Sequence, residues 1–317
     1  MFVLGCLALL GQSTFIFAGP GTGKTLISLF LLLKALMSGT LGKARVYYIN
    51  LDDHLRGLFE KFPVTAEYGF KLISDNYYGF SASSLIGLLE QMARDGSAKN
   101  AVILLDTVKK VVNVMDKKEV SQFMSAVRRF VLKGGTFIGL AHTNKHTDNN
   151  GNPVPGGTSD IRDDADCTYT VREIEGGADT NEKFVEFECT KQRGPNVAKV
   201  AYAYSLDRDI SYTDLLLSVR ELGSEHLSAT KQAANQASEA SVIEVIRTCI
   251  AEGFNTKTKL VIEVSERSGL SRKRAGETID RHAGDDPLRH LWRFTVGPHG
   301  SHVYQLLEPE PPQPADG

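Results

Sequence analysis

The residues with the clearest chemistry lie in one short segment, Ala18-Gly19-Pro20-Gly21-Thr22-Gly23-Lys24-Thr25. Closely spaced glycines let successive backbone N–H groups turn towards one anion, and a following helix N-terminus adds partial positive charge. In such a pattern Lys24 reaches the β- and γ-phosphates of a nucleotide and the Thr25 hydroxyl ligates Mg²⁺. The segment predicts a Walker A loop that binds ATP and Mg²⁺, with Ala18 in place of the usual leading glycine. The alternative is a chance glycine-rich turn.

Carboxylates that would complete this site end two apolar runs. Asp106 closes the run 101–106, where a carboxylate holds Mg²⁺ through water in nucleotide-hydrolysing enzymes. Asp52 and Asp53 directly follow the run 45–51, and either could polarise the attacking water. Aspartate is also a favoured helix cap, so the alternatives are a capping role for Asp106 and an exposed capping pair at 52 and 53.

Four apolar runs supply the strands that must position these residues. They are 14–18, 45–51, 101–106 and 136–141, and helix-length segments separate them. Apolar residues recur at helical spacing between 120 and 131, which predicts a crossover helix between neighbouring strands. The pattern predicts an α/β fold with a parallel sheet and helices on both faces. After residue 166, alternating segments predict antiparallel strands added to that sheet.

Composition divides the chain into four parts. Residues 1–225 form the α/β domain, and 226–240 are rich in Ser, Ala, Gln and Asn, which predicts a linker. Residues 241–307 form a second domain. The proline-rich acidic tail 308–317 is expected to be disordered.

Overall charge and cysteine use restrict the classes of function. The 36 Lys+Arg and 38 Asp+Glu give a net charge of −2, so any nucleic-acid affinity must come from local basic patches. Four scattered cysteines form no disulfide framework, and no apolar run approaches a membrane span. The N-terminal Val3-Leu4-Gly5-Cys6 looks like a lipobox, but no basic region precedes it. A cytoplasmic protein without a membrane partner is expected.

The ordered motifs of residues 7 to about 206 resemble RecA-like ATPases, most closely the hexameric plasmid and phage replicative helicases of the RepA and DnaB kind. The resemblance implies a P-loop core in which Asp52 stands where the family has a catalytic glutamate. That departure makes slow or conditional hydrolysis an open outcome. His142, in Ala141-His142-Thr143-Asn144-Lys145, is similar to the family's γ-phosphate sensor. The alternative for a lone histidine after a strand is a structural role.

Two further segments follow from the resemblance. Thr190-Lys191-Gln192-Arg193-Gly194-Pro195 is similar to the DnaB-type stretch whose lysine and arginine reach a neighbour's γ-phosphate, which implies a site shared between subunits. Residues 146–160, with Lys145 before them, correspond to a mobile DNA-binding loop. The alternatives are a solvated hairpin turn for the first segment and a surface insertion for the second.

The second domain has the pattern of a winged helix-turn-helix. Apolar faces at 242–250 and 260–264 precede a turn at Ser268-Gly269-Leu270, and the next helix carries Arg272, Lys273 and Arg274. Residues 292–306 then alternate around a Gly/Pro turn, as a wing does. This domain has ten Lys+Arg and eight Asp+Glu, so its basic character is confined to one helix. Winged helices bind either DNA or protein, and the choice stays open.

The sequence therefore predicts an ATP- and Mg²⁺-dependent DNA motor, helicase-like, in the replication or recombination of a mobile element. Its expected partners are further copies of itself, in a hexamer or another ring or filament, and DNA, with single strands preferred. One rival is a nucleotide-gated DNA-binding regulator or loader without helicase activity. A second is a small-molecule kinase, which would leave the wing and the Lys-x-Arg segment without a purpose. Polarity, DNA versus RNA, ring size and the completeness of the N-terminus stay open.

Overall fold

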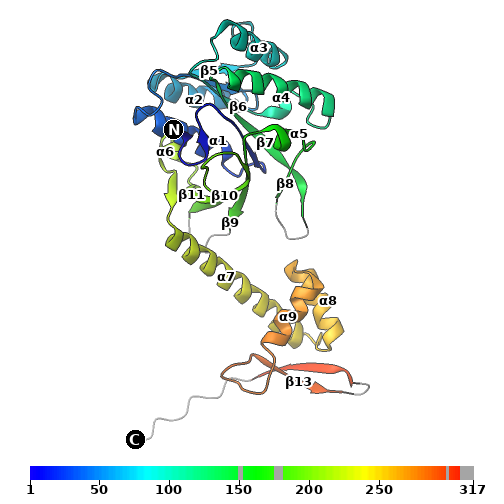
Figure 1. Cartoon of the computed structure of the whole chain (residues 1–317). Coiled ribbons are helices and arrows are strands. Elements are labelled where there is room, and N and C mark those ends of the chain that lie inside the picture. Colours follow the sequence, from blue (N-terminus) through cyan, green and yellow to red (C-terminus); the bar gives the residue numbers. More distant parts are fainter. Residues whose placement is uncertain (149–152, 175–180, 298–299, 308–317) are drawn as a thin grey trace, which may run out of the picture. The chain divides into compact units, whose positions relative to one another are not determined.

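The apolar runs form the centre of one large sheet in the computed structural model, which describes residues 1–148, 153–174, 181–297 and 300–307 (Figure 1). The strand order is β12-β11-β10-β9-β3-β7-β6-β4-β5, and β8 pairs with the end of β7. The six strands from β9 to β5 are parallel, which confirms an α/β fold with a mostly parallel central sheet. The bounds are β3 Ser13–Ala18, β4 Arg45–Asn50, β5 Lys71–Ser74, β6 Ala101–Asp106, β7 Thr136–Thr147, β8 Pro153–Pro155, β9 Cys167–Ile174, β10 Glu182–Gln192, β11 Lys199–Ser205 and β12 Arg220–Leu222.

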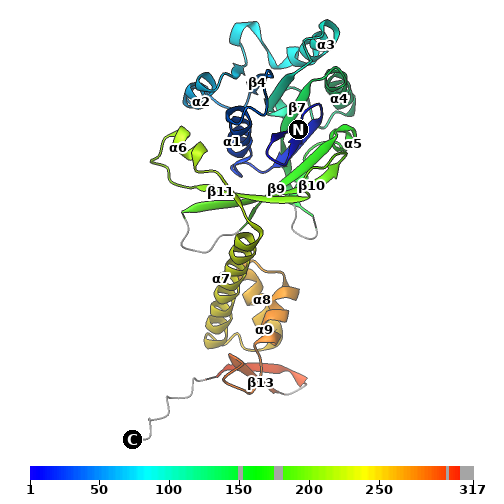
Figure 2. The ribbon, with the colours of Figure 1, turned by 60° about the vertical axis from the view of Figure 1, so that its left-hand side comes forward.

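Helices cover both faces of this sheet, as Figures 1 and 2 show. The first face carries α1, α2 and α6, and the second carries α3, α4 and α5. Their bounds are α1 Lys24–Met37, α2 Leu55–Glu67, α3 Leu85–Asp95, α4 Lys117–Leu132, α5 Asp160–Asp164 and α6 Tyr212–Leu217. The predicted crossover helix is α4, which connects the paired strands β6 and β7. Among the described residues, no helix has the length and apolarity that a membrane span requires.

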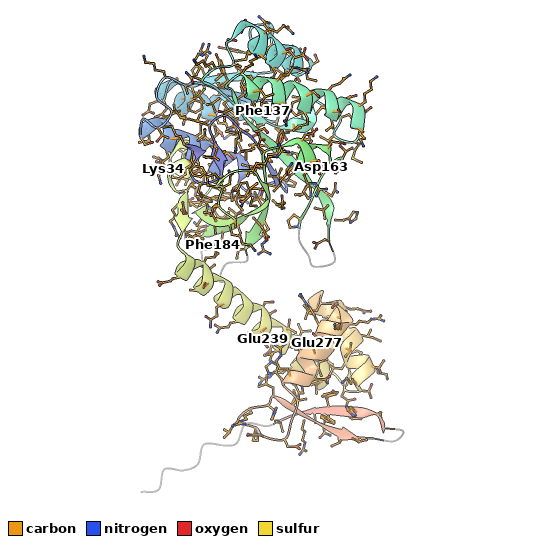
Figure 3. The ribbon with its side chains drawn as sticks, in the orientation of Figure 1. Lys34, Phe137, Asp163, Phe184, Glu239 and Glu277 are labelled. Atoms are coloured by element: carbon orange, nitrogen blue, oxygen red, sulfur yellow. The ribbon has the colours of Figure 1, made fainter. Side chains whose placement is uncertain are left out.

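The core forms two layers because successive strand side chains point to opposite faces. In β3, Ile16 and Ala18 join the cluster under α1, whereas Phe15 and Phe17 join the cluster under α4. All four are at most 1% exposed, so both faces of the central strand are sealed. Phe137 of β7 extends the second layer and packs its ring 5.8 Å from that of Phe15 (Figure 3). This burial explains why the strand sequences are apolar throughout rather than alternating.

One detail of the predicted topology is wrong, and one element was not predicted. The strand β9 is parallel to β3, with Ala18 opposite Val171, so only β10, β11 and β12 form the antiparallel part. A crossover through β8 and α5 returns the chain to the end of the sheet where the parallel strands begin, and β9 therefore runs parallel to β3. The N-terminus also forms a hairpin that the sequence did not indicate, from β1 Phe2–Leu4 and β2 Ala8–Leu9. This hairpin packs on α1.

The chain divides into two compact units, Met1–Thr230 and Lys231–Gly317. The division falls inside the segment 226–240, which was predicted to be a linker. This segment belongs to one continuous helix, α7 Ser224–Ala251. A Ser/Ala/Gln-rich composition suits a linker, but alanine and glutamine are also good helix formers, and here the helix propensity prevails. The proline-rich tail 308–317 lies outside the described residues.

The second unit consists of helices and one hairpin around a small core. Its elements after α7 are α8 Lys257–Ser268, α9 Arg272–Arg281, β13 Trp292–Val296 and β14 His302–Leu306. Trp292 is completely buried, and its Nε1 donates to the Ile279 carbonyl over 2.8 Å. Gly269 ends α8 with a φ of +71°, and the Ser271 hydroxyl caps α9 by accepting from the Arg274 N–H over 3.3 Å. These contacts attach the hairpin to α9 and fix the turn before it.

Candidate active site

The turn between β3 and α1 has a backbone that requires its glycines. Gly21 and Gly23 have φ of +70° and +81°, in the left-handed region that other residues rarely adopt. Gly23 is also the N-cap of α1, and a Cβ added there would lie 2.5 Å from a ring carbon of Tyr204. Both the conformation and the available space therefore demand glycine at position 23.

Two side chains of the antiparallel strands hold the Gly21 carbonyl. Lys183 Nζ donates to this oxygen over 3.2 Å, and the Tyr204 hydroxyl donates over 3.5 Å. Lys183 is also paired with Glu173 at 3.0 Å. Sequence reasoning missed both residues, because nothing in the local pattern of β10 or β11 marks a contact with a loop 162 residues earlier.

Lys24 and Thr25, the first residues of α1, lie beside Asp106 at the end of β6. The Thr25 hydroxyl donates to Asp106 Oδ2 over 2.6 Å. Lys24 is 7% exposed and Asp106 is 4% exposed. Burial raises the pKa of Asp106 above its ordinary value, while Thr25 and Lys24 act in the opposite direction. Three of the predicted site residues thus meet at the carboxyl ends of the strands.

The oxygen atoms of Thr25 and Asp106 suit a magnesium ion. Asp106 Oδ1 is buried and has no hydrogen-bond partner among the described residues. Mg²⁺ is bound by one or two protein oxygens and keeps water or phosphate oxygens as its other ligands. The described residues contain no group of three or more His, Cys, Asp or Glu side chains arranged to hold a metal. This pair would therefore hold Mg²⁺ only together with phosphate.

Replacing Asp106 with asparagine is expected to raise the unfolding temperature of the ligand-free protein at neutral pH. Burial raises the folded-state pKa of Asp106, so its ionised form at neutral pH costs folding free energy that an amide does not. The gain should shrink as the pH falls towards the range in which the wild-type carboxyl is protonated. Thermal unfolding at a series of pH values measures this difference. The exposed Asp209→Asn is the control, and a lower midpoint for Asp106→Asn would contradict the expectation.

The two carboxylates after β4 have different partners. Asp53 is paired with Lys61 and accepts a hydrogen bond from Asn50 Nδ2 over 2.7 Å. Asp52 Oδ2 lies 3.9 Å from His142 Nε2, and Asp52 Oδ1 lies 3.8 Å from Lys109 Nζ. Asp52 is thus the carboxylate that faces the other predicted site residues, and its charge contributes to the raised pKa of Asp106.

His142 of β7 lies next to the strand that precedes the glycine turn, since it is the register partner of Ala18. Burial, followed by the charges of Lys24 and Lys109, lowers the pKa of His142 below its ordinary value. The imidazole is therefore neutral at neutral pH, with one nitrogen as donor and the other as acceptor. Its Nε2 is buried and has no hydrogen-bond partner among the described residues, so it can respond to a group that enters the site.

The predicted loop 146–160 is partly replaced by a hairpin. The strand β7 continues to Thr147, and β8 pairs back on it with Thr147 opposite Pro153. Prolines are tolerated there because β8 is an edge strand. The short helix α5 then starts at Asp160. Residues 149–152 and the side chain of Lys145 lie outside the described part of the chain, so the predicted DNA contact of Lys145 stays a prediction.

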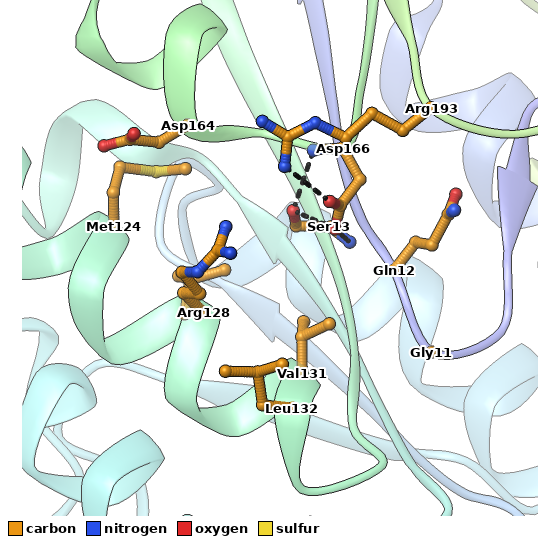
Figure 4. Close-up of a pocket in the computed structure, with 11 residues that line it drawn as sticks. Gly11, Gln12, Ser13, Met124, Arg128, Val131, Leu132, Asp164, Asp166 and Arg193 are labelled. Carbon is orange, nitrogen blue, oxygen red and sulfur yellow. Dashed lines mark hydrogen bonds and ion pairs between the residues drawn. The ribbon is translucent and has the colours of Figure 1, made fainter.

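Lys191 and Arg193 lie near the amino ends of the parallel strands, whereas Lys24 lies near their carboxyl ends. Lys191 Nζ donates to the carbonyl oxygens of Arg162 and Asp163, and Arg193 Nη1 lies 3.3 Å from Asp166 Oδ1. Figure 4 shows Arg193 and Asp166 on the wall of a cavity of about 210 Å³, together with Ser13, the first residue of β3. The glycine turn follows the last residue of β3, about 16 Å away at the usual rise per strand residue. Within one chain these side chains do not join the site.

The helix α9 presents the predicted basic residues to solvent. Arg272, Lys273 and Arg274 are exposed, and none of the three has an ion-pair partner among the described residues. Ala275 and Ile279 on the other side are completely buried in the core of the unit. The helix is therefore amphipathic in the predicted sense, with one basic end free of internal partners.

Comparison with known proteins adds no identification. No protein-family model matches the chain, and no curated protein resembles it closely enough to count as a match.

Proposed function

We propose that this protein is an ATP- and Mg²⁺-dependent P-loop ATPase with a RecA-like core that works as a DNA motor. The observation that carries the proposal is the convergence of the glycine turn, Lys24, Thr25 and Asp106 at one end of the sheet. The strand order supports the RecA-like assignment, because β7 lies between the phosphate-loop strand β3 and the Asp106 strand β6. Ligands of open α/β sheets bind outside the carboxyl ends of the strands, which is where these residues lie.

The phosphates of ATP would bind to the backbone N–H groups between Gly19 and Thr25 and to the ammonium group of Lys24. A Mg²⁺ ion held by Thr25 and Asp106 would neutralise charge that develops on the phosphate oxygens. Asp52 would orient the attacking water and accept its proton. The neutral His142 would detect the γ-phosphate. A cavity of about 780 Å³ beside Gly21 leaves room for the nucleoside.

A second copy of the chain would complete this site. Arg193 and Lys191 would reach the neighbour's γ-phosphate, because an arginine fork neutralises the charge of phosphoryl transfer. Two facts support this role. Both residues carry positive charge at the end of the strands opposite to their own phosphate loop. Arg193 is also 45% exposed in spite of its pairing with Asp166. If every subunit contacts its neighbour in this head-to-tail way and the rotation closes, the subunits form a ring with cyclic symmetry.

The second unit would be a winged helix that contacts DNA. The turn at Gly269 connects α8 to α9, as the turn of a helix-turn-helix would, and α9 would be the recognition helix. The antiparallel pair β13–β14 would be the wing. The exposed basic residues Arg272, Lys273 and Arg274 would contact phosphates. By contrast, Arg281 is paired with Glu239 at 2.8 Å and is less available to DNA.

Single-stranded DNA is expected to raise the ATP hydrolysis rate several-fold, and the protein is expected to separate a forked duplex in the presence of ATP and Mg²⁺. The reason is that a motor couples each turnover to movement along its track. Steady-state hydrolysis with and without DNA, together with strand displacement, measures both effects. Changing Arg272, Lys273 and Arg274 together to alanine should lower the DNA-stimulated rate at moderate salt and leave the basal rate unchanged. Arg289→Ala, an exposed arginine outside α9, is the matched control.

A nucleotide-gated DNA-binding regulator is the second candidate. The observation that favours it is the state of Asp52, a short carboxylate whose two oxygens already lie within 4 Å of His142 and Lys109. Such a carboxylate would activate water slowly and suit a switch. DNA binding that depends on ATP, with no stimulated hydrolysis and no strand displacement, would establish the regulator and exclude the motor.

A further inference from the structure

The side chain of Asn50, at the end of β4, uses its whole hydrogen-bonding capacity. Its Nδ2 donates to the Tyr48 hydroxyl over 3.0 Å and to Asp53 Oδ2 over 2.7 Å. Its Oδ1 accepts from the backbone N–H groups of Asp52 and Asp53 over 3.2 and 3.1 Å. A primary amide has two N–H donors and two acceptor lone pairs, so no capacity remains. Asn50 is also 1% exposed, and this arrangement is therefore shielded from water.

These bonds fix the chain at the point where it leaves the sheet. An amide oxygen that accepts from the second and third following residues closes an Asx turn, and here it holds the backbone on which both acidic side chains are mounted. The donor side of the same amide holds the carboxylate of Asp53. Lys61 of α2, 8% exposed, pairs with that carboxylate as well. Asp53 is thus held through its Oδ2 by both Asn50 and Lys61, whereas Asp52 faces His142.

The same turn is connected to the metal-binding carboxylate. Asn50 is the register partner of Asp106 across the β4–β6 pair, and the Leu51 N–H donates to the Asp106 carbonyl over 2.5 Å. Burial, followed by the charge of Asp106, raises the pKa of Tyr48 well above its ordinary value, so this phenol keeps its proton beside the site. The turn that Asn50 closes is therefore joined by a backbone hydrogen bond to the strand end that carries Asp106.

We propose that Asn50 is a positioning residue that selects Asp52 as the water-orienting carboxylate, by fixing the strand-end turn and by holding Asp53 against Lys61. This inference rests on the proposed ATPase function. It assigns Asn50 no contact with substrate. Its role is to set the distance between Asp52 and the position of the attacking water, where a displacement of about 1 Å can cost about 100-fold in rate.

The test compares Asn50→Ala, Asn50→Asp and the exchanged pair Asn50→Asp/Asp53→Asn. In Asn50→Asp, a second carboxylate would lie against Asp53, and the two charges would repel. In the exchanged pair the asparagine at position 53 can donate to the aspartate at position 50, and the Tyr48 hydroxyl can reverse its role and donate too. Lys61, which shares the Asp53 oxygen with Asn50 in the wild type, must then turn to the amide oxygen at position 53 or to the new carboxylate. The number of carboxylates then equals that of the wild type. Asp95→Ala is the matched control, because it removes the same kind of side-chain bond, to the Ser97 N–H over 2.8 Å, at an exposed turn.

Each variant is measured for kcat, for ADP affinity by calorimetry and for unfolding temperature. Both single variants are expected to lose about 10- to 100-fold in kcat while their ADP affinity stays within about threefold of the wild type. The exchanged pair should recover part of this loss, because the strand-end turn is restored while Lys61 loses the Asp53 carboxylate, and Asp95→Ala should match the wild type. Asn50→Ala leaves buried polar atoms unpaired and can lose stability, so the comparison of Asn50→Asp with the exchanged pair decides the outcome.

Three results would overturn the inference: a wild-type kcat for Asn50→Asp, an exchanged pair no faster than Asn50→Asp, or an ADP affinity that falls as much as kcat. Failure of the proposed function looks different. In that case the wild-type protein itself would hydrolyse no ATP, and Lys24→Ala would bind ADP as tightly as the wild type does.

Discussion

Lys24→Ala is expected to lower the rate of ATP hydrolysis by about 100-fold or more and to weaken nucleotide binding. The Lys24 ammonium group is almost completely buried, and its charge acts on both Asp106 and His142. Removal of a cation from a poorly hydrated site leaves the phosphate charge and the Asp106 carboxylate uncompensated, and such electrostatic contributions are among the largest in catalysis. Steady-state hydrolysis and ADP calorimetry measure the two effects.

Lys34→Ala is the matched control for this change. Lys34 lies in the last turns of the same helix, and its side chain is exposed (Figure 3). An alanine at this position has good helix propensity, so the expected change in rate is small. Equal losses in both variants would mean that the effect arises from the stability of α1 rather than from the phosphate site. A wild-type rate for Lys24→Ala would contradict the assignment of the glycine turn.

Arg193→Ala is expected to lower hydrolysis by about 100-fold or more without weakening ADP binding, since an arginine of this kind acts on the transferring γ-phosphate. The distinctive result concerns mixtures. A subunit with Lys24→Ala still carries Arg193, and a subunit with Arg193→Ala still carries Lys24. After subunit exchange, the contact between the two can therefore form an intact site. An equal mixture of the two inactive proteins should recover about a quarter of the wild-type rate if contacts form at random.

Two outcomes would exclude the shared site. A wild-type rate for Arg193→Ala removes the need for the arginine, and a mixture without recovered activity shows that it does not act on a neighbour. Arg45→Ala is the control, because Arg45 also lies at the amino end of a parallel strand, where it donates to the Ser97 carbonyl over 2.7 Å. The Arg193–Asp166 pair is half-exposed, so its loss should change stability by less than about 1 kcal/mol.

The sequence predicted correctly those strands whose residues are all buried, because their burial leaves a continuous apolar run. The run 101–106 coincides with β6 because every residue in it is buried on both sides, which leaves a continuous apolar signal. The direction of β9 was mistaken, because strand alternation carries no information on which neighbour a strand pairs with. The linker prediction for 226–240 left its helical state open, because small polar residues suit a coil and a helix almost equally.

The candidate site shows the same division. Lys24, Thr25 and Asp106 were predicted to lie together because the spacing of their motifs follows from the chemistry of phosphate and metal binding, and Thr25 does contact Asp106. Lys61 and Tyr204 were not identified, since their roles come from contacts that no local pattern encodes. Asn50 left a usable signal: an amide at the end of an otherwise apolar strand, directly before two acids, indicates a turn that needs side-chain hydrogen bonds.

The contact of Tyr204 with the glycine turn has a consequence for how this turn forms. The hydroxyl that binds the Gly21 carbonyl comes from a residue 183 positions later in the chain. During synthesis, the complete motif leaves the ribosome long before β10 and β11 can join the sheet and support it. The loop is therefore a short sequence with a long-range folding requirement, and contacts of this range form slowly. A nascent chain that ends before residue 204 contains every residue of the motif but lacks this support.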